Sequence, residues 1–232
     1  EIAEISARIV WVLRPPDLPP DEEPTPMAWP PTLPSLPPVV LERLAVERLI
    51  LDAPISGERT ETAIAGRMSE RGGLVQALLR ADRRDGPRAF VRLLVTANPR
   101  DWTLAVELAA EEAPGGPLGL ALDPSGADCR RGPLVVALAG EGPLDDWTGR
   151  LSARLADRPL WETDISLGVP LTPKARARLA LTGFAAPLPG MLPPQAAALA
   201  ERIDFSLAGG TVLGTDAVFA EPSSITMGPA RL

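Results

Sequence analysis

Short runs of alternating apolar and polar residues, separated by turn signals, occupy most of the chain after residue 60. Successive side chains of a β-strand point to opposite faces, so this alternation predicts strands with one apolar and one polar face. The sharpest example is a predicted hairpin of two strands, 89–97 and 102–110, joined by a turn at 98–101. Arg92, Thr96 and Glu107 fall mainly on its polar face, which predicts a sheet covered on one side only.

The pattern recurs further along the chain. An apolar run at 134–139 is followed by a predicted turn at 140–146 and an alternating run at 147–155. Further alternating runs follow at 163–169, 175–181 and 203–207, and the segment 193–202 predicts a short helix with a proline near its start. Repeated short strands between turn signals predict an all-β fold, a long antiparallel meander with little helix.

The N-terminal third is less regular. Residues 1–13 predict a strand, because Ile9, Val10 and Val12 are β-branched. The stretch 15–38 is dense in proline, which predicts an extended linker or surface loop. The repeated unit at 41–49 fits either a strand or a short helix with charged residues on its surface. We therefore divide the chain into 1–38, a first strand with a proline-rich linker, and 39–232, a repetitive β-sheet domain.

Composition removes most kinds of catalytic chemistry. The 232 residues include no histidine and one cysteine, Cys129, so histidine general bases, histidine-dependent nucleophiles and ordinary zinc sites are excluded. The acidic pairs Glu111-Glu112 and Asp145-Asp146 are interpreted as solvated turn charges. An arginine cluster, Arg80, Arg83, Arg84 and Arg88, is interpreted as a hydrated hairpin tip. We expect no enzyme activity, no cofactor and no metal.

Net charge and hydropathy limit which kinds of partner the chain is expected to bind. The net charge is −7, which argues against nucleic acid as a main ligand. No apolar run approaches the roughly 18 to 20 residues that span a bilayer as a helix. The chain starts at Glu1 without an export signal, so we expect a fragment of a longer protein whose membrane anchor lies elsewhere.

An apolar sheet face has to be covered by something. The pattern alone favours a second sheet and an ordinary core. The face is rich in Leu, Val and Ala, however, and aromatic residues make up only 4% of the chain. Such a surface also suits flexible hydrocarbon chains, so an open groove remains the alternative.

Particular residues resemble a known family. The run 140–151, Gly-Glu-Gly-Pro-Leu-Asp-Asp-Trp-Thr-Gly-Arg-Leu, is similar to a segment of TamB-like translocation and assembly module proteins of the AsmA/TamB type. The segments 104–108, 111–116 and 41–54 resemble the same family. The resemblance covers roughly residues 38 to 181, and the proline-rich stretch has no counterpart in it.

The resemblance implies a fold, a location and a cargo. It implies a long sheet curled into an open groove, a β-taco, in the periplasm of a Gram-negative bacterium, with the parent chain anchored in the inner membrane. It also implies outer-membrane biogenesis, phospholipid transport and a TamA-like outer-membrane barrel partner that binds outside this fragment. The groove residues would be Val91, Leu93, Val95, Leu104, Val106, Leu108, Leu151, Leu155, Ile165, Leu167, Leu179, Leu181, Ile203 and Phe205. The competing function is a structural or adhesive β-repeat protein with a filled apolar core.

Overall fold

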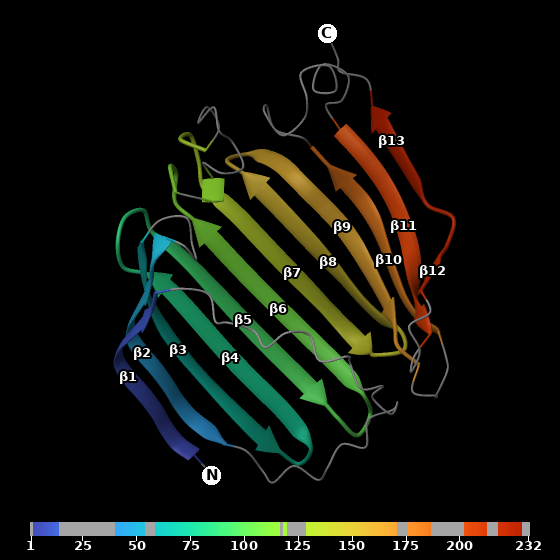
Figure 1. The fold of residues 1–232 in the computed structure, drawn as a ribbon. Helices are drawn as coiled ribbons and strands as arrows, with labels where there is room; N and C mark the ends of the chain where they lie inside the picture. The colour runs from blue at the N-terminus through green and yellow to red at the C-terminus, as the bar shows by residue number, and fades with distance from the viewer. Residues whose placement is uncertain are drawn as a thin grey trace.

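The computed structural model describes residues 2–13, 40–53, 59–116, 118–119, 129–170, 176–186, 202–212 and 218–228. Within these residues the chain forms one sheet of thirteen strands (Figure 1). The strands are β1 (Ile2–Val12), β2 (Leu41–Leu51), β3 (Thr60–Arg71), β4 (Leu74–Arg83), β5 (Ala89–Asn98), β6 (Thr103–Glu112), β7 (Leu134–Pro143), β8 (Trp147–Leu155), β9 (Arg158–Gly168), β10 (Arg176–Ala185), β11 (Arg202–Val212), β12 (Val218–Ala220) and β13 (Ser224–Gly228).

The strand order in the sheet follows the order in the sequence from β1 to β12, and β13 pairs with β11 beside β12. Every neighbouring pair is antiparallel except β1 and β2, which are parallel. The sheet is not closed: it curls between two outer edges, β1 on one side and β12 with β13 on the other (Figure 1). The prediction of an all-β, open, curled meander is therefore confirmed.

Tight turns make this meander possible. At the turn between β3 and β4, Gly72 and Gly73 both have positive φ, 64° and 89°, which glycine adopts without steric cost. Trp102 and Ala156 have φ near the same region, 52° and 53°, at the turns before β6 and β9. The strands themselves alternate between faces as the sequence pattern predicts.

Several predicted boundaries need correction. The predicted turn at 140–146 is too long, because β7 continues to Pro143 and only 144–146 separate it from β8. The segment 41–49 lies in strand β2, which removes the helical alternative. Glu111 and Glu112 are the last residues of β6 and not part of a turn. Strand β4 did not stand out in the sequence, because its alternation is broken by two adjacent leucines, Leu78 and Leu79.

Two predicted segments lie outside the described residues. The proline-rich stretch 15–38 is one of them. The other is the predicted helix at 193–202, of which only Arg202 is described, and it begins strand β11.

The sheet carries little conventional core. The buried hydrophobic residues of the described part are Ile50, Cys129, Leu134, Trp147, Leu155 and Leu160. Four of these, Cys129, Leu134, Leu155 and Leu160, form one cluster, which Val136 and Ala153 contact. Most other apolar side chains are only half-buried, because no second sheet covers the described strands. Among the described residues, then, no second sheet forms the predicted ordinary core with this one.

Candidate apolar groove

The strand register aligns the apolar side chains into rows that cross the sheet. Directly paired residues of neighbouring strands lie on the same face, so a row can be followed from strand to strand. The central row consists of Leu79, Leu93, Leu108, Leu138 and Leu151, one leucine from each strand from β4 to β8. Five leucines in register make a continuous aliphatic ridge across the middle of the sheet.

Further apolar rows flank this one. On one side the row is Met68, Ala77, Val95, Val106, Gly140, Gly149, Ile165, Leu181 and Leu207. On the other side it is Ile64, Ala81, Val91, Ala110, Val136, Ala153, Trp161, Ala185 and Ile203. The same face therefore presents an apolar band that is several side chains wide and continues across nine strands.

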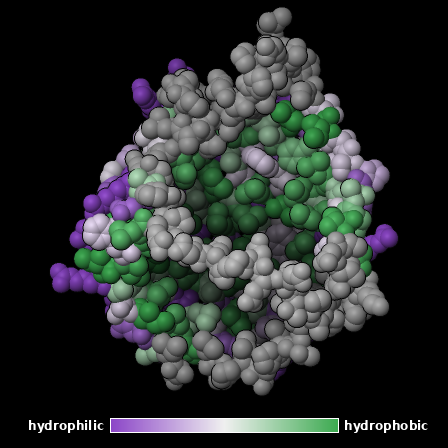
Figure 2. All heavy atoms as spheres, in the orientation of Figure 1, coloured by the Kyte–Doolittle hydropathy of each residue, from purple (hydrophilic) through white to green (hydrophobic). Residues whose placement is uncertain are grey.

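Figure 2 looks onto this face, and hydrophobic side chains line a hollow in its middle. All fourteen residues that the family resemblance implied for a groove lie on this face. Thirteen of them are at least partly exposed, for example Val91 at 41% and Leu179 at 44%. Leu155 is the exception: it is fully buried in the cluster with Leu134 and Leu160, so it packs against its neighbours and does not line the groove.

Trp147 explains the glycines of the motif at 140–151. Its side chain leaves β8 and lies across Gly140 of β7 and above Gly149, and a Cβ at either glycine would overlap the indole ring. The ring reaches β6, where Nε1–H donates to the carbonyl oxygen of Leu104 at 3.0 Å. The motif therefore packs the indole, 6% exposed, tightly against β6, β7 and β8, so it holds these strands together beneath the apolar face.

The buried cluster of Cys129, Leu134, Leu155 and Leu160 lies at one end of strands β7, β8 and β9. Glu112 lies beside it, 4% exposed, and its carboxylate accepts hydrogen bonds from the backbone N–H of Gly119 at 2.7 Å and of Leu118 at 3.2 Å. The prediction that Glu112 is a solvated turn charge was wrong. The sequence signal that was missed is its position: it continues the apolar alternation of Leu104, Val106, Leu108 and Ala110, so it had to face the apolar side.

The apolar face becomes aromatic at β9 and β11. Trp161 is 43% exposed and its ring meets that of Phe205 edge to face, with centroids 5.9 Å apart. The Trp161 indole N–H donates to the hydroxyl of Thr163, a buried residue in the leucine row. Sequence alternation predicted Thr163 and Phe205 on this face but not the aromatic pair, which depends on register across three strands.

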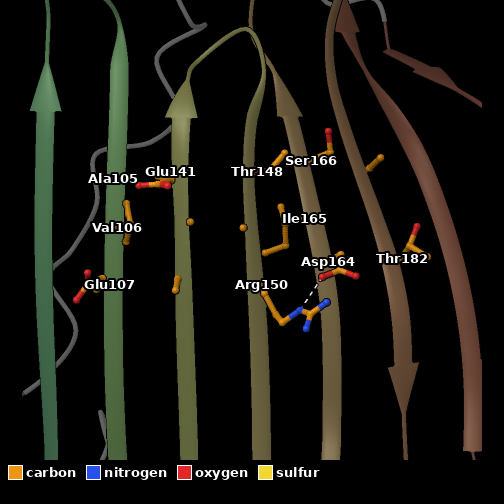
Figure 3. A pocket seen from close by; sticks show the side chains of 14 residues that line it. Ala105, Val106, Glu107, Glu141, Thr148, Arg150, Asp164, Ile165, Ser166 and Thr182 are labelled. Atoms are coloured by element: carbon orange, nitrogen blue, oxygen red, sulfur yellow. Dashed lines mark hydrogen bonds and ion pairs between the residues drawn. The ribbon is translucent and has the colours of Figure 1, made fainter.

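The opposite face is polar and carries exposed ion pairs. Arg150 of β8 contacts Asp164 of β9 at 2.8 Å and Glu162 at 3.6 Å. The hydrogen bond from Arg150 lowers the pKa of Asp164 below its ordinary value. A hollow of about 630 Å³ surrounds this pair, with Glu107, Glu141 and Thr182 among the residues lining it (Figure 3). Exposed charges on this face disfavour the stacking of one sheet on another.

Candidate catalytic groups are not brought together. Cys129 is 1% exposed inside the apolar cluster. In the described residues no group of three or more metal-ligating side chains occurs, and no helix has the length and hydropathy needed to cross a membrane. The arginines of the predicted hairpin tip do not act as one cluster. Arg80 lies within β4 and pairs with Asp82 at 2.7 Å, whereas Arg83 pairs with Asp85 at 3.2 Å.

Comparisons with family models, curated proteins and solved structures found no match to this chain. The fold and the site therefore define the class: a single-layer, open β-sheet with one hollow apolar face and one charged face.

Proposed function

We propose that the apolar face holds the hydrocarbon chains of lipids, with the polar parts of the lipid outside the hollow. The observation that supports this is the continuous apolar band, with its in-register leucines from β4 to β8, on a face that no second layer of described residues covers. An exposed apolar surface of this extent is characteristic of a binding surface.

The energetics favour a flexible apolar ligand. Covering apolar surface contributes about 25 cal/mol per Å², so each half-exposed leucine adds roughly 1 kcal/mol when an acyl chain covers it. The floor is built largely from Leu, Val, Ala and Gly, with no polar group among the five central leucines. Such a surface offers many similar contacts and few specific ones, which suits cargo that differs in chain length.

We further propose that the segment belongs to a periplasmic scaffold for outer-membrane biogenesis, whose parent chain is anchored in the inner membrane. The support is the resemblance of the run 140–151 to TamB-like proteins together with the open, curled meander. In this proposal the cargo is phospholipid, or the segment assists outer-membrane protein assembly, and a TamA-like barrel would bind elsewhere on the parent protein.

Photo-crosslinking at two adjacent leucines tests lipid binding. Leu93 lies in the apolar row, whereas Leu94 pairs with Leu78 on the polar face. A photo-reactive residue at 93 should give lipid adducts in cells, and the same residue at 94 should give few. Adducts to the protein itself at both positions, together with no phospholipid in extracts of the purified protein, would contradict the proposal and favour a structural β-repeat.

A further inference from the structure

A row of paired residues crosses the polar face at one end of strands β1 to β5. Trp11 pairs with Ile50, which pairs with Glu61. The backbone N–H of Arg84 donates to the carbonyl oxygen of Glu61, and Arg88 lies directly across the next turn from Arg84. That turn lies beside the end of β2 (Figure 1). Paired residues share a face, so the side chains of this row lie together on the outer side of the curled sheet.

Two large apolar side chains are exposed at the β1 end of this row. Trp11 is 53% exposed, and Leu13, two residues further along, is 58% exposed. Strand β1 is an outer edge of the described sheet, so no described strand covers them from that side. The Arg59 guanidinium lies over the Trp11 ring, 5.1 Å from the ring centroid. An aromatic ring and a cation are therefore exposed together, a combination typical of side chains at a membrane–water interface.

The arginines at this end of the sheet exceed the carboxylates that pair with them. Three carboxylates are already bound by other arginines, in the pairs Arg48–Glu61, Arg80–Asp82 and Arg83–Asp85. Arg59, Arg84 and Arg88 are exposed and form no ion pair within the part of the chain that the structure describes. Glu111 of β6 faces the same side, but no ion pair joins it to them. Arg84 and Arg88 oppose each other, an arrangement of like charges that costs stability and that a bound anion would relieve.

We propose that this basic corner, defined as Trp11, Leu13, Arg59, Arg84 and Arg88, docks on the surface of an anionic lipid bilayer. The arginines bind phosphate groups, while the two apolar side chains enter the boundary between head groups and acyl chains. Trp11 and Arg84 lie three strand spacings apart, about 14 Å, so the corner contacts several lipid head groups at once.

A bilayer fits this corner better than a protein partner does. A stable protein interface buries about 800 Å² on each side, whereas the corner offers five side chains at the end of an outward-curving face. A bilayer admits single side chains, and each arginine near an anionic surface adds its own attraction. The net charge of −7 does not prevent this contact. Glu107, for example, lies six residues along β6 from the partner of Arg88, roughly 20 Å away, where salt screens its charge.

The proposal does not rest on lipid binding by the apolar face. The corner lies on the opposite face, and Leu94 lies six residues beyond Arg88 along β5, roughly 20 Å from it. A docked corner therefore keeps Leu94 away from the bilayer. Photo-crosslinking at residues 93 and 94 then reports on the apolar face alone.

Co-sedimentation with vesicles tests the corner. Vesicles of equal parts phosphatidylglycerol and phosphatidylcholine should bind the chain, and binding should weaken as salt is raised or when phosphatidylcholine is used alone. The double variant Arg84→Ser with Arg88→Ser should lower the partition coefficient at least about tenfold. Trp11→Ser should lower it at least about threefold and leave its salt dependence unchanged.

A matched control removes the same charge elsewhere on this face. Arg67 and Arg71 are exposed on β3, pair with Leu78 and Leu74 of β4, and lie toward the other end of the strand. Arg67→Ser with Arg71→Ser should therefore keep the partition coefficient within about twofold of the original. Leu93→Glu, on the apolar face, should leave vesicle binding unchanged. Circular dichroism should show an intact sheet in every variant.

Three results would overturn the proposal. The first is no binding to phosphatidylglycerol vesicles at low salt, and the second is full binding by Arg84→Ser with Arg88→Ser. The third is an equal loss in the two double variants, which would mean that total charge and not the corner attracts the vesicles. If vesicles are not bound and a photo-reactive residue at position 84 forms adducts with an acidic protein, the corner is a protein-binding surface instead.

Discussion

The indole of Trp147 covers Gly140, and this contact requires both residues. The ring crosses from β8 over β7 and donates its N–H to the carbonyl of Leu104 on β6. A Cβ at position 140 would overlap the ring, so glycine is the residue that permits the crossing. The contact ties three neighbouring strands together on the apolar face.

We expect Gly140→Val to displace the Trp147 ring and break its hydrogen bond to Leu104. The loss should lower the free energy of unfolding by roughly 2 to 3 kcal/mol, through overpacking and an unsatisfied indole N–H. Urea denaturation followed by tryptophan fluorescence measures it. Ala139→Val is the matched control, because residue 139 faces the polar side, and should change stability by less than about 0.5 kcal/mol. Equal effects of the two substitutions would contradict the role given to the glycine.

Glu112 anchors the segment at 118–119 to the closed end of the sheet. Glu112→Gln keeps the shape of the side chain but replaces one acceptor oxygen by a donor, which would point at a backbone N–H. We expect a loss of about 1 to 3 kcal/mol in the free energy of unfolding. Hydrogen exchange should also show faster exchange of the Gly119 amide. Glu111→Gln, one residue earlier and exposed, should leave both measurements unchanged.

Acid should weaken one exposed ion pair in a predictable direction. The hydrogen bond from Arg48, at 2.7 Å, lowers the pKa of Glu61 below its ordinary value. A carboxylate with a lowered pKa in the folded state adds stability above its unfolded pKa and loses it as the pH falls through the folded pKa. The free energy of unfolding should therefore fall more steeply from about pH 5 to pH 3 in the original chain than in Glu61→Gln. The difference should be small and should shrink in high salt, since the pair is solvent-exposed. Identical pH profiles would show that the pair contributes nothing.

The sequence predicts the strands and their faces well, because side-chain alternation has a period of two and needs no information from distant residues. The hairpin of β5 and β6 is the clearest case, with Val95 opposite Val106 as alternation and a short turn require. The run at 74–83 was not recognised as strand β4, because Leu78 and Leu79 are both apolar while their side chains point to opposite faces.

Other features depend on contacts between strands and could not be predicted. The burial of Glu112 depends on backbone N–H groups six and seven residues away. The extension of β7 to Pro143 depends on pairing with Thr103 to Ala105 of β6. Trp147 lying over Gly140 also gives a glycine a place inside a strand instead of at a turn. The alternation of apolar and polar residues could not decide between a filled core and an open face, because both give the same pattern along each strand.

Adjacent leucines on opposite faces offer a direct test of the groove by substitution. Leu93→Glu places a carboxylate in the middle of the leucine row, whereas Leu94→Glu places it on the charged face. Burying a carboxylate under hydrocarbon costs several kcal/mol, so we expect Leu93→Glu to lose most of the bound lipid that mass spectrometry detects in extracts. The sheet itself should remain folded by circular dichroism, because no second layer of described residues covers position 93. Leu94→Glu should keep its lipid. If Leu93→Glu unfolds the protein while Leu94→Glu does not, the apolar face is a filled core, and the structural function replaces lipid binding.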